Sequence, residues 1–437
     1  MSLKIALATR RQFIRLGGAA TALGAFPAWV PSRVFGARSP SNQINFGLVG
    51  CGPMGCSDFE NIVRAAPELG VRARAVCDVD AVRARKAASE VDACYGSRES
   101  CLVFGDFRQL TRHPDVDAVI VATPDHWHAL VALDAIRHGK DVYVEKPLTL
   151  TLAEGRALAD ACAAHKRVGQ TGTQQRSSRN FRHACELVRN GRLGKIHHVE
   201  ITIPPNNRHC AATWSEDPVP EGFDYDFWLG PAPWAPFTRQ RTHYSFRFIL
   251  DYALGQTTNF GAHHVDICQW ALGRDDTGPV RYEGYGEFPS SGLFTCPTLV
   301  DVKAHYADGV KMTICNRGAD GGSGGVRFHG ENGWLEVTRR GLKASNPALL
   351  KEQIGQGEIR LYESRNHIGN FIRCIRSRET PISPLSVGHR TTSICICSML
   401  AMQLRRPLEW DPVREEFKDD LAANRLRSRA MRGEWCL

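Results

Sequence analysis

The stretch from Ile44 to Gly55, which reads I-N-F-G-L-V-G-C-G-P-M-G, most constrains what this chain can fold into. An apolar run ends at Val49, three glycines follow at positions 50, 52 and 55, and the residues after them have a helical pattern. In such a strand–turn–helix unit the first glycine permits a tight turn. The second lets the backbone approach a pyrophosphate, and the third lets the helix pack closely on the strand. The stretch predicts a dinucleotide-binding unit whose cofactor contacts include Gly50, Gly52, Pro53, Met54 and Gly55. The alternative is a glycine-rich turn without a nucleotide.

An acidic residue stands at the end of the next predicted strand, where Val76-Cys77-Asp78 closes the run 71–77. A carboxylate at that place accepts hydrogen bonds from the adenosine ribose and repels a 2′-phosphate. Asp78 is therefore predicted to bind the cofactor and to favour NAD over NADP.

Strand and helix patterns alternate through the first part of the chain, which indicates a parallel sheet with right-handed crossovers. Ligands bind such sheets at the carboxyl ends of the strands. Gly50, Asp78, Thr123 and Lys146 all follow predicted strands, so we expect them to converge. Strands are predicted at 71–77, 117–122, 141–144 and 167–172, and helices at 81–91, 107–112, 129–138 and 152–165.

The pattern changes after Gly194 to strands joined by turns, which indicates a largely antiparallel sheet in a second, α+β domain. We expect a signal and linker over residues 1–41, a Rossmann domain over 42–172 and the α+β domain over 173–437, with a mobile glycine-rich loop at 318–325. In this second region strands are predicted at 196–204, 280–288, 298–306, 310–316, 326–329 and 333–338, and helices at 261–272, 368–376 and 391–404.

The N-terminus has the features of an export signal. Arg10-Arg11 form a twin-arginine pattern, and the weakly apolar run 16–26 is too short for a membrane anchor. A periplasmic or otherwise exported protein without an anchor after processing is therefore predicted; the alternative is a disordered basic tail. The first 38 residues hold six basic and no acidic residues, so the net charge of +9 falls to +3 without them. Net charge thus gives no reason to expect nucleic-acid binding.

Cysteine and other metal-ligating residues show no compact spacing. The fifteen cysteines are scattered without a C-x-x-C pair, and we interpret most of them as small buried hydrophobes. No metal site is predicted.

Three later motifs, together with the glycine stretch, resemble the Gfo/Idh/MocA family of oxidoreductases over most of residues 44–400. They are Thr123-Pro124-Asp125-His126-Trp127-His128, Glu145-Lys146-Pro147 and Asn259-Phe260-Gly261-Ala262-His263-His264-Val265-Asp266. The resemblance implies a Rossmann domain followed by a domain with a large open sheet. It also implies a homo-oligomer, a dimer or tetramer, that assembles through this sheet.

The resemblance further implies hydride transfer between a sugar, polyol or carbohydrate derivative and a nicotinamide. Lys146 and His263 would be the catalytic pair, because the reaction needs a base for the hydroxyl proton and a group that stabilises charge on oxygen. Pro147 would follow a cis peptide. The cofactor would also contact Thr123, Pro124, His128, Glu145 and Lys146. The alternatives are an exposed loop lysine at Lys146, and packing roles for His128 and His263.

Asn259 departs from the family pattern, in which many sugar dehydrogenases have an aspartate four residues before the histidine. An asparagine hydrogen-bonds a substrate but takes no proton. Asp266 lies three residues after His263 and could orient it. Substrate contacts are predicted for Gln174, Arg176, Asn259, His263 and Asp266. For Arg176 a surface salt bridge is the alternative, and His389 and Arg390 are weaker candidates for the cleft.

The first functional hypothesis is an exported NAD-dependent oxidoreductase that retains its cofactor and acts on a sugar or polyol. The second is an NAD-dependent glycoside hydrolase or lyase that works by transient oxidation and elimination; the presence of Lys146 favours the first. The third is a sugar-binding protein that kept the fold without the activity.

Overall fold

A six-stranded parallel sheet forms the first half of the chain in the computed structural model, which describes residues 43–97, 100–206, 213–317 and 322–437. Its strand order, β3-β2-β1-β4-β5-β6, is that of a Rossmann fold. The strands are β1 (Ile44–Val49), β2 (Val71–Cys77), β3 (Leu102–Phe104), β4 (Ala118–Val121), β5 (Asp141–Val144) and β6 (Gly169–Thr171).

Helices cover both faces of this sheet, because its strands are buried on both sides. They are α2 (Pro53–Leu69), α3 (Ala81–Tyr95), α4 (Phe107–Thr111), α5 (Asp125–Arg137) and α6 (Leu152–Ala164). Local sequence sets where they begin. Pro53 stands in the first turn of α2, the Asp80 carboxylate caps α3, and Thr151 and Glu154 form a capping box on α6.

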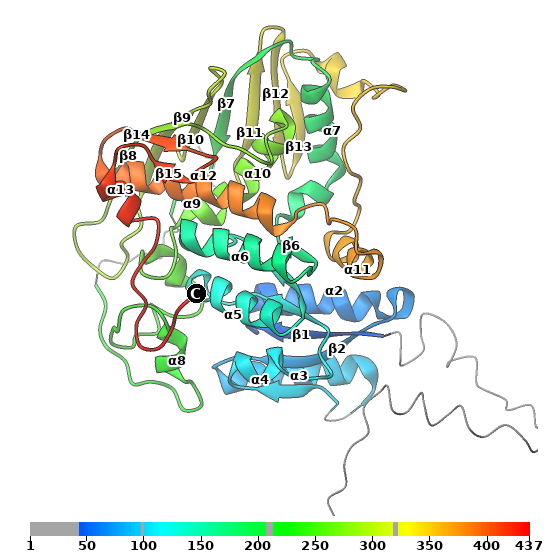
Figure 1. Ribbon diagram of the computed structural model, residues 1–437, viewed down its shortest axis with the longest axis vertical. Helices are drawn as coiled ribbons and strands as arrows, with labels where there is room; N and C mark the ends of the chain where they lie inside the picture. Colours follow the sequence, from blue (N-terminus) through cyan, green and yellow to red (C-terminus); the bar gives the residue numbers. More distant parts are fainter. Residues whose placement is uncertain (1–42, 98–99, 207–212, 318–321) are drawn as a thin grey trace, which may run out of the picture. The chain divides into compact units, whose positions relative to one another are not determined.

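A helix from late in the chain completes the Rossmann core. Helix α11 (His367–Ser377) packs beside α2, as Figure 1 shows, and its Phe371 and Ile372 are fully buried in one hydrophobic cluster with Phe46 and Ile62. The first sheet therefore depends on residues about 300 positions away in the sequence.

The second sheet has nine strands in the order β13-β12-β11-β7-β10-β9-β8-β14-β15. All its pairings are antiparallel except that between β7 and β10. The strands are β7 (Ile196–Thr202), β8 (Arg281–Glu287), β9 (Leu299–His305), β10 (Lys311–Cys315), β11 (Gly325–Gly330), β12 (Gly333–Thr338), β13 (Gly341–Ala344), β14 (Leu408–Asp411) and β15 (Glu416–Phe417).

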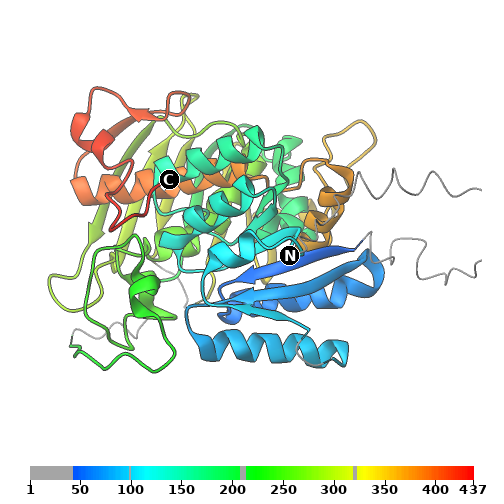
Figure 2. The ribbon, with the colours of Figure 1, turned by 60° about the horizontal axis from the view of Figure 1, so that its bottom comes forward.

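Three helices bury the apolar face of this sheet: α7 (Arg179–Arg189), α10 (Gly261–Leu272) and α12 (Leu385–Leu404). Helix α12 is buried on nearly all sides, since it lies between the sheet and α6 (Figure 2). Short helical segments lie between the longer elements: α8 (Tyr225–Leu229), α9 (Gln256–Asn259), α13 (Leu421–Arg425) and the 3₁₀ turns Gln174–Ser177, Ser245–Phe248 and Pro347–Lys351.

The predicted fold class is confirmed: a parallel Rossmann sheet is followed by an α+β part with a mainly antiparallel sheet. The sequence did not predict α7 or the short strands β3, β13, β14 and β15, and α12 begins six residues before its predicted start. The twin-arginine segment and linker lie outside the described residues, as does part of the predicted 318–325 loop. Residues 43–437 form one compact unit. Within the described residues no helix is long and apolar enough to cross a membrane.

Candidate active site

The glycine turn after β1 leaves no room for a side chain at Gly50 or at Gly55. Gly50 has φ +96°, and a Cβ there would lie 2.5 Å from the Ala122 carbonyl oxygen. A Cβ on Gly55 would lie 2.1 Å from the carbonyl oxygen of Gly50, so α2 packs directly on the turn. At Gly52 the nearest atom, in Arg83, is 3.7 Å from such a Cβ, and this side of the turn faces a cavity. The turn is therefore a backbone cradle of the kind that binds a pyrophosphate.

Asp78 holds this turn in place. Its carboxylate accepts hydrogen bonds from the backbone N–H of Cys51 at 2.7 Å and from that of Asp80 at 2.9 Å. Burial raises the pKa of Asp78, while these two N–H donors lower it. The carboxylate also lines the cavity, so it lies where a ribose hydroxyl would meet it.

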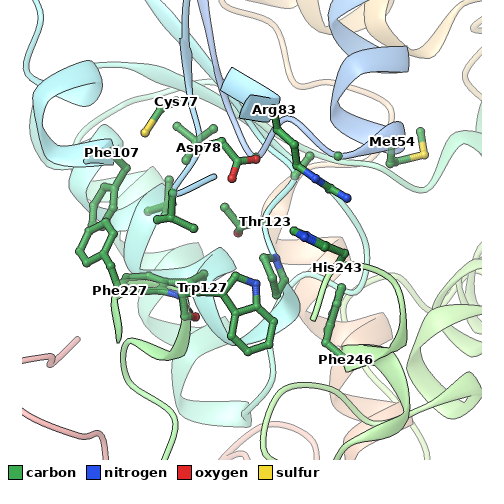
Figure 3. A pocket seen from close by; sticks show the side chains of 18 of the residues that line it. Met54, Cys77, Asp78, Arg83, Phe107, Thr123, Trp127, Phe227, His243 and Phe246 are labelled. Atoms are coloured by element: carbon green, nitrogen blue, oxygen red, sulfur yellow. Dashed lines mark hydrogen bonds between the residues drawn. The ribbon is translucent and has the colours of Figure 1, made fainter. Parts of the chain in front are cut away.

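The cavity beside the turn has a volume of about 490 Å³. Figure 3 shows Asp78 and Thr123 at its floor and aromatic rings around it. Among the predicted cofactor contacts, those that line it are Gly50, Gly52, Pro53, Met54, Asp78, Thr123 and Pro124. The rest of the wall consists of aromatic and basic residues that were not predicted as cofactor contacts: Arg83, Phe107, Trp127, Phe227, Trp228, His243, Tyr244, Phe246 and Arg247.

Part of that wall comes from residues 222–248, far along the chain from the Rossmann strands. The backbone N–H of Ala81 donates to Gly222 O, and that of Asp224 donates to Val79 O, each at 2.9 Å. The indole N–H of Trp127 donates to Trp228 O, also at 2.9 Å. The aromatic Asp226-Phe227-Trp228 run in the sequence was the available signal for this wall, but nothing in it pointed to the cavity.

Lys146 lies at the end of β5. In the described part of the chain its Nζ bonds only Asn259, at 2.7 Å from Oδ1 and 3.0 Å from the backbone oxygen. The Lys146–Pro147 peptide is cis, as predicted. Burial lowers the pKa of Lys146 to about 8, against the opposing effect of the Glu145 carboxylate. The alternative of an exposed loop lysine is therefore ruled out, and the Lys146 amine can lose a proton near neutral pH.

His263 lies in the first turn of α10 and is 4% exposed. Its Nδ1 has no hydrogen-bond partner in the described part of the chain. Burial, and then the nearby Lys146 cation, lower the pKa of His263 well below its usual value. The ring is thus neutral, with a buried nitrogen that a bound hydroxyl can satisfy.

Glu145 is held from three sides. Gln174 Nε2 donates to its Oε1 at 2.8 Å, and the backbone N–H of Lys146 donates to Oε2 at 3.2 Å. Burial and the Glu145 charge raise the pKa of the buried Asp58 on α2, so Asp58 keeps a proton that it shares with Glu145. Gln174, predicted as a substrate contact, is occupied in holding this carboxyl pair.

His128 supports the site from behind, since it is not in the cavity wall. Its Nδ1 lies 2.8 Å from Pro147 O and its Nε2 lies 2.9 Å from Thr123 O. The ring therefore fixes the two strand-end loops to one another, and its packing role is the one that the structure supports.

The predicted roles of Arg176 and Asp266 are wrong. Arg176 is 2% exposed, and its Nε donates to the Asp266 carboxylate at 2.8 Å, while its Nη2 donates to Asp275 at 2.7 Å. Asp266 also accepts from Thr391, and it has no hydrogen bond to His263. A buried ion pair therefore replaces both the predicted substrate contacts and the alternative surface salt bridge.

His389 and Arg390 do not reach the site either. Both bind the Glu415 carboxylate, at 2.8 Å and 2.6 Å. No group of three potential metal ligands occurs in the part of the chain that the structure describes, and the cysteine thiols described there are free.

Two models of one protein family match the sequence of this chain. The NAD-binding Rossmann fold of an oxidoreductase family matches residues 44–173, and its C-terminal alpha/beta domain matches residues 207–437. The chain belongs to the Gfo/Idh/MocA oxidoreductase family. The sequence-based resemblance is confirmed.

Curated relatives in this family are distant. An inositol 2-dehydrogenase of Burkholderia cenocepacia (strain HI2424) is 27% identical over 233 residues, which are 53% of this chain and 55% of that protein. A glycosyl hydrolase family 109 protein of Shewanella sp. (strain ANA-3) is 27% identical over 208 residues, 44% of this chain and 45% of that protein. The chain thus spans about half the length of the curated relatives that it matches.

Solved structures of Gfo/Idh/MocA proteins share the fold. An oxidoreductase domain protein from Kribbella flavida has a TM-score of 0.63 at 21% identity. The match covers 84% of this chain and 99% of that protein's chain. Levoglucosan dehydrogenase, solved with NADH and levoglucosan, has a TM-score of 0.61 at 18% identity, with the same two coverages. At these identities the likeness shows the fold alone.

Proposed function

We propose that this protein is an NAD-dependent oxidoreductase that transfers a hydride between a nicotinamide and a carbon of a sugar, polyol or related carbohydrate. The observation that supports this most is the environment of Lys146 at the end of β5, where its half-buried amine bonds the neutral oxygens of Asn259 and burial lowers its pKa to about 8. A structural lysine gains nothing from such a site, because burial without a carboxylate bond disfavours its charge.

The residues present fit a dinucleotide. The glycine turn presents bare backbone to the cavity at Gly50 and Gly52, and the Asp78 carboxylate lines the same cavity, where it could bind a ribose. The bound cofactor would supply the hydride acceptor, held by the turn residues, Asp78, Thr123 and Pro124. We propose NAD over NADP, since the Asp78 carboxylate would repel a 2′-phosphate.

Lys146 is arranged to take the hydroxyl proton. Its neutral amine has two N–H groups and one lone pair, and the two oxygens of Asn259 accept the two N–H groups. The lone pair is left for the substrate hydroxyl. When the proton arrives, the ammonium has a third N–H with which it can stabilise the new carbonyl oxygen.

His263 would bind the same substrate oxygen from the other side. Its ring is neutral and its Nδ1 is unpartnered, so the group can hydrogen-bond a hydroxyl without competing for the proton. Asn259 acts through Lys146 and not as a base. The predicted catalytic pair of Lys146 and His263 is thus kept in this proposal.

Export by the twin-arginine route, with folding and cofactor binding before transport, is also proposed for this chain; Arg10-Arg11 support it. The aromatic walls around the cavity support slow release of the cofactor. We further propose a homo-oligomer that assembles through the nine-stranded sheet, whose second face has no covering helix.

An NAD-dependent glycoside hydrolase or lyase is the second candidate, because one of the relatives is named a glycosyl hydrolase. It would use the same Lys146 and the same cofactor, but it would release sugar without net cofactor reduction.

One experiment separates these candidates. Purified protein is denatured, any released dinucleotide is identified with its redox state, and cofactor absorbance at 340 nm is followed in intact protein with a panel of sugars, polyols and aryl glycosides. Reduction by a free sugar supports the dehydrogenase. Release of the aryl group without net reduction supports the hydrolase, and failure to bind either dinucleotide refutes both.

A further inference from the structure

A cation from the open sheet reaches the candidate active site. Arg339 lies in the turn between β12 and β13, and its guanidinium lies over the Phe260 ring, 5.4 Å from the centroid. Phe260 directly follows Asn259, which holds Lys146, and its ring lies 6.3 Å from that of His263. Phe260 thus lies between Arg339 and His263, and Phe260 and Asn259 lie between Arg339 and Lys146.

Gln175 fixes this position. In the amide orientation that satisfies both of its ends, its nitrogen donates to His263 O at 3.0 Å and its oxygen accepts from Arg339 Nε at 3.3 Å. The side chain of Arg339 is thus connected to the backbone of the residue that would bind the substrate oxygen. The Nε is used in this bond, so the two terminal nitrogens form the free end of the guanidinium.

Within residues 43–97, 100–206, 213–317 and 322–437, neither terminal nitrogen of Arg339 has a hydrogen-bond or ion-pair partner. By contrast, Arg327 on β11 pairs with Glu336, and Arg176 pairs with two aspartates. Arg339 is exposed to solvent, so its free end is accessible. Burial of part of the side chain lowers the pKa of Arg339, and its charge lowers the pKa of both Lys146 and His263.

In the described part of the chain no carboxylate contacts Arg339 directly; Glu145 acts on it only through its charge, which partly opposes the lowering of the Arg339 pKa by burial. Lys146 and Arg247 add positive charge, while the acidic groups nearby are Glu145, Asp58 and Asp125. Glu145 already accepts from Gln174 and from the Lys146 backbone, and Asp58 shares its proton with Glu145. Asp125 is 7% exposed at the start of α5 and has no ion pair with Arg339.

We propose that Arg339 is a specificity residue whose free guanidinium edge binds an anionic group, a carboxylate or a phosphate, on the carbohydrate substrate. This rests on the proposed function, which it narrows from sugars in general to acidic sugars. The two terminal nitrogens of a guanidinium match the two oxygens of a carboxylate or phosphate, and such bidentate pairs are stronger than neutral hydrogen bonds. The anion also offsets the positive charge that Arg339 places next to Lys146.

A structural role for Arg339, stacking on Phe260, is the competing explanation, and binding measurements distinguish the two. Full-length protein saturated with NAD is titrated with matched ligands by calorimetry: glucose, glucuronate and glucose 6-phosphate. We expect one of the two acidic ligands to bind at least about tenfold more tightly than glucose, with the preference falling as salt is added.

The variant Arg339→Gln should abolish that preference, so that the ratio of the affinities for the acidic ligand and for glucose falls to about one. The next residue gives the matched control, because Arg340 lies in the same turn but lines a different groove, with Glu200 and Glu336. Arg340→Gln should keep the preference. Glucuronate as the tighter ligand assigns a carboxylate, and glucose 6-phosphate as the tighter ligand assigns a phosphate.

Equal binding of all three ligands overturns the proposal, and so does a preference that survives in Arg339→Gln. Both outcomes leave the proposed dehydrogenase intact if cofactor reduction by any sugar is seen. Conversely, an Arg339-dependent preference in a protein that reduces no cofactor would support the anion site while refuting the proposed reaction.

Discussion

Lys146 is a half-buried cation and Arg176 is a buried one. The partners of both lie around helix α10, but the two cations are bound in opposite ways. The ammonium of Lys146 donates to two neutral oxygens of Asn259. The guanidinium of Arg176 donates to the carboxylates of Asp266 and Asp275 and lies over the Trp270 ring. Only the second has charges that compensate for its burial through direct hydrogen bonds.

The difference shows in protonation. Burial lowers the pKa of Lys146 to about 8. For Arg176 the two aspartates outweigh burial and raise the pKa, so the group never loses its proton. A buried cation with neutral partners is suited to exchange a proton, whereas one with charged partners is suited to hold the fold.

The largest effect is expected from Lys146→Gln. Loss of the base should lower kcat by about 10²- to 10⁴-fold, the usual contribution of a general base. Because the amine is poorly compensated in the folded state, the free energy of unfolding should stay the same or increase. Steady-state assays with the best substrate and urea unfolding test the two parts, and dinucleotide retention is the control. A variant with normal kcat would show that Lys146 is not the base.

The opposite pattern is expected from Arg176→Met. Removing the guanidinium leaves Asp266, which is 0% exposed, without its main partner, so unfolding should become easier by about 3–5 kcal/mol. The double variant Arg176→Met with Asp266→Asn should recover part of this loss, because it removes the stranded charge. The catalytic constants of the folded fraction should change little. A loss of kcat without a loss of stability would place Arg176 in the reaction.

The variant Asn259→Asp would make Lys146 resemble Arg176. A carboxylate beside the ammonium favours the charged form and should raise the pKa of Lys146 by about 1–3 units. The proton acceptor is the neutral amine, so activity rises with pH through the Lys146 pKa, near 8 in the natural protein. In the variant that rise should move to higher pH, and activity at pH 7.5 should fall about tenfold or more. An unchanged pH profile of kcat/KM would contradict this.

Sequence patterns predicted the parts of the site that depend on local backbone. The turn at Gly50, the carboxylate of Asp78 and the cis peptide before Pro147 follow from short motifs, and the structure has each in its expected place. Strand periodicity likewise gave the Rossmann sheet, since its buried strands read as continuous apolar runs.

Side chains whose partners are distant in sequence were not predictable. Asp266 shares a helical face with His263, which suggested an orienting contact, but its partner is Arg176, 90 residues away. The two residues do share a helical face, but the predicted contact between them was wrong, because three-dimensional packing brings Arg176 to Asp266 instead. Arg339 and the aromatic wall around Phe227 were missed for the same reason: nothing near them in sequence marks the cavity or the site that they approach.

The smallest effect is expected from a residue at the end of the chain. Trp435 packs edge-on against Trp127 at 4.8 Å and lies 5.5 Å from Phe227, and both of these rings line the cavity. Backbone and side-chain bonds of Arg432 to Pro231 and Asp226 hold this tail in place. The tail therefore supports the cavity wall from behind without touching the space that a cofactor would take.

Removing that support in Trp435→Ala should cost about 1 kcal/mol of dinucleotide affinity, a rise of about fivefold in Kd, because each aromatic pair contributes about 0.5–1.5 kcal/mol beyond its buried area. Lys146 is not among the residues that line this cavity, so kcat at saturating cofactor should stay constant. The matched control is Trp234→Ala, which removes a tryptophan that is 67% exposed. If both variants bound NAD as the natural protein does, the tail would be a peripheral contact; a fall in kcat would instead connect the wall to the geometry of Lys146.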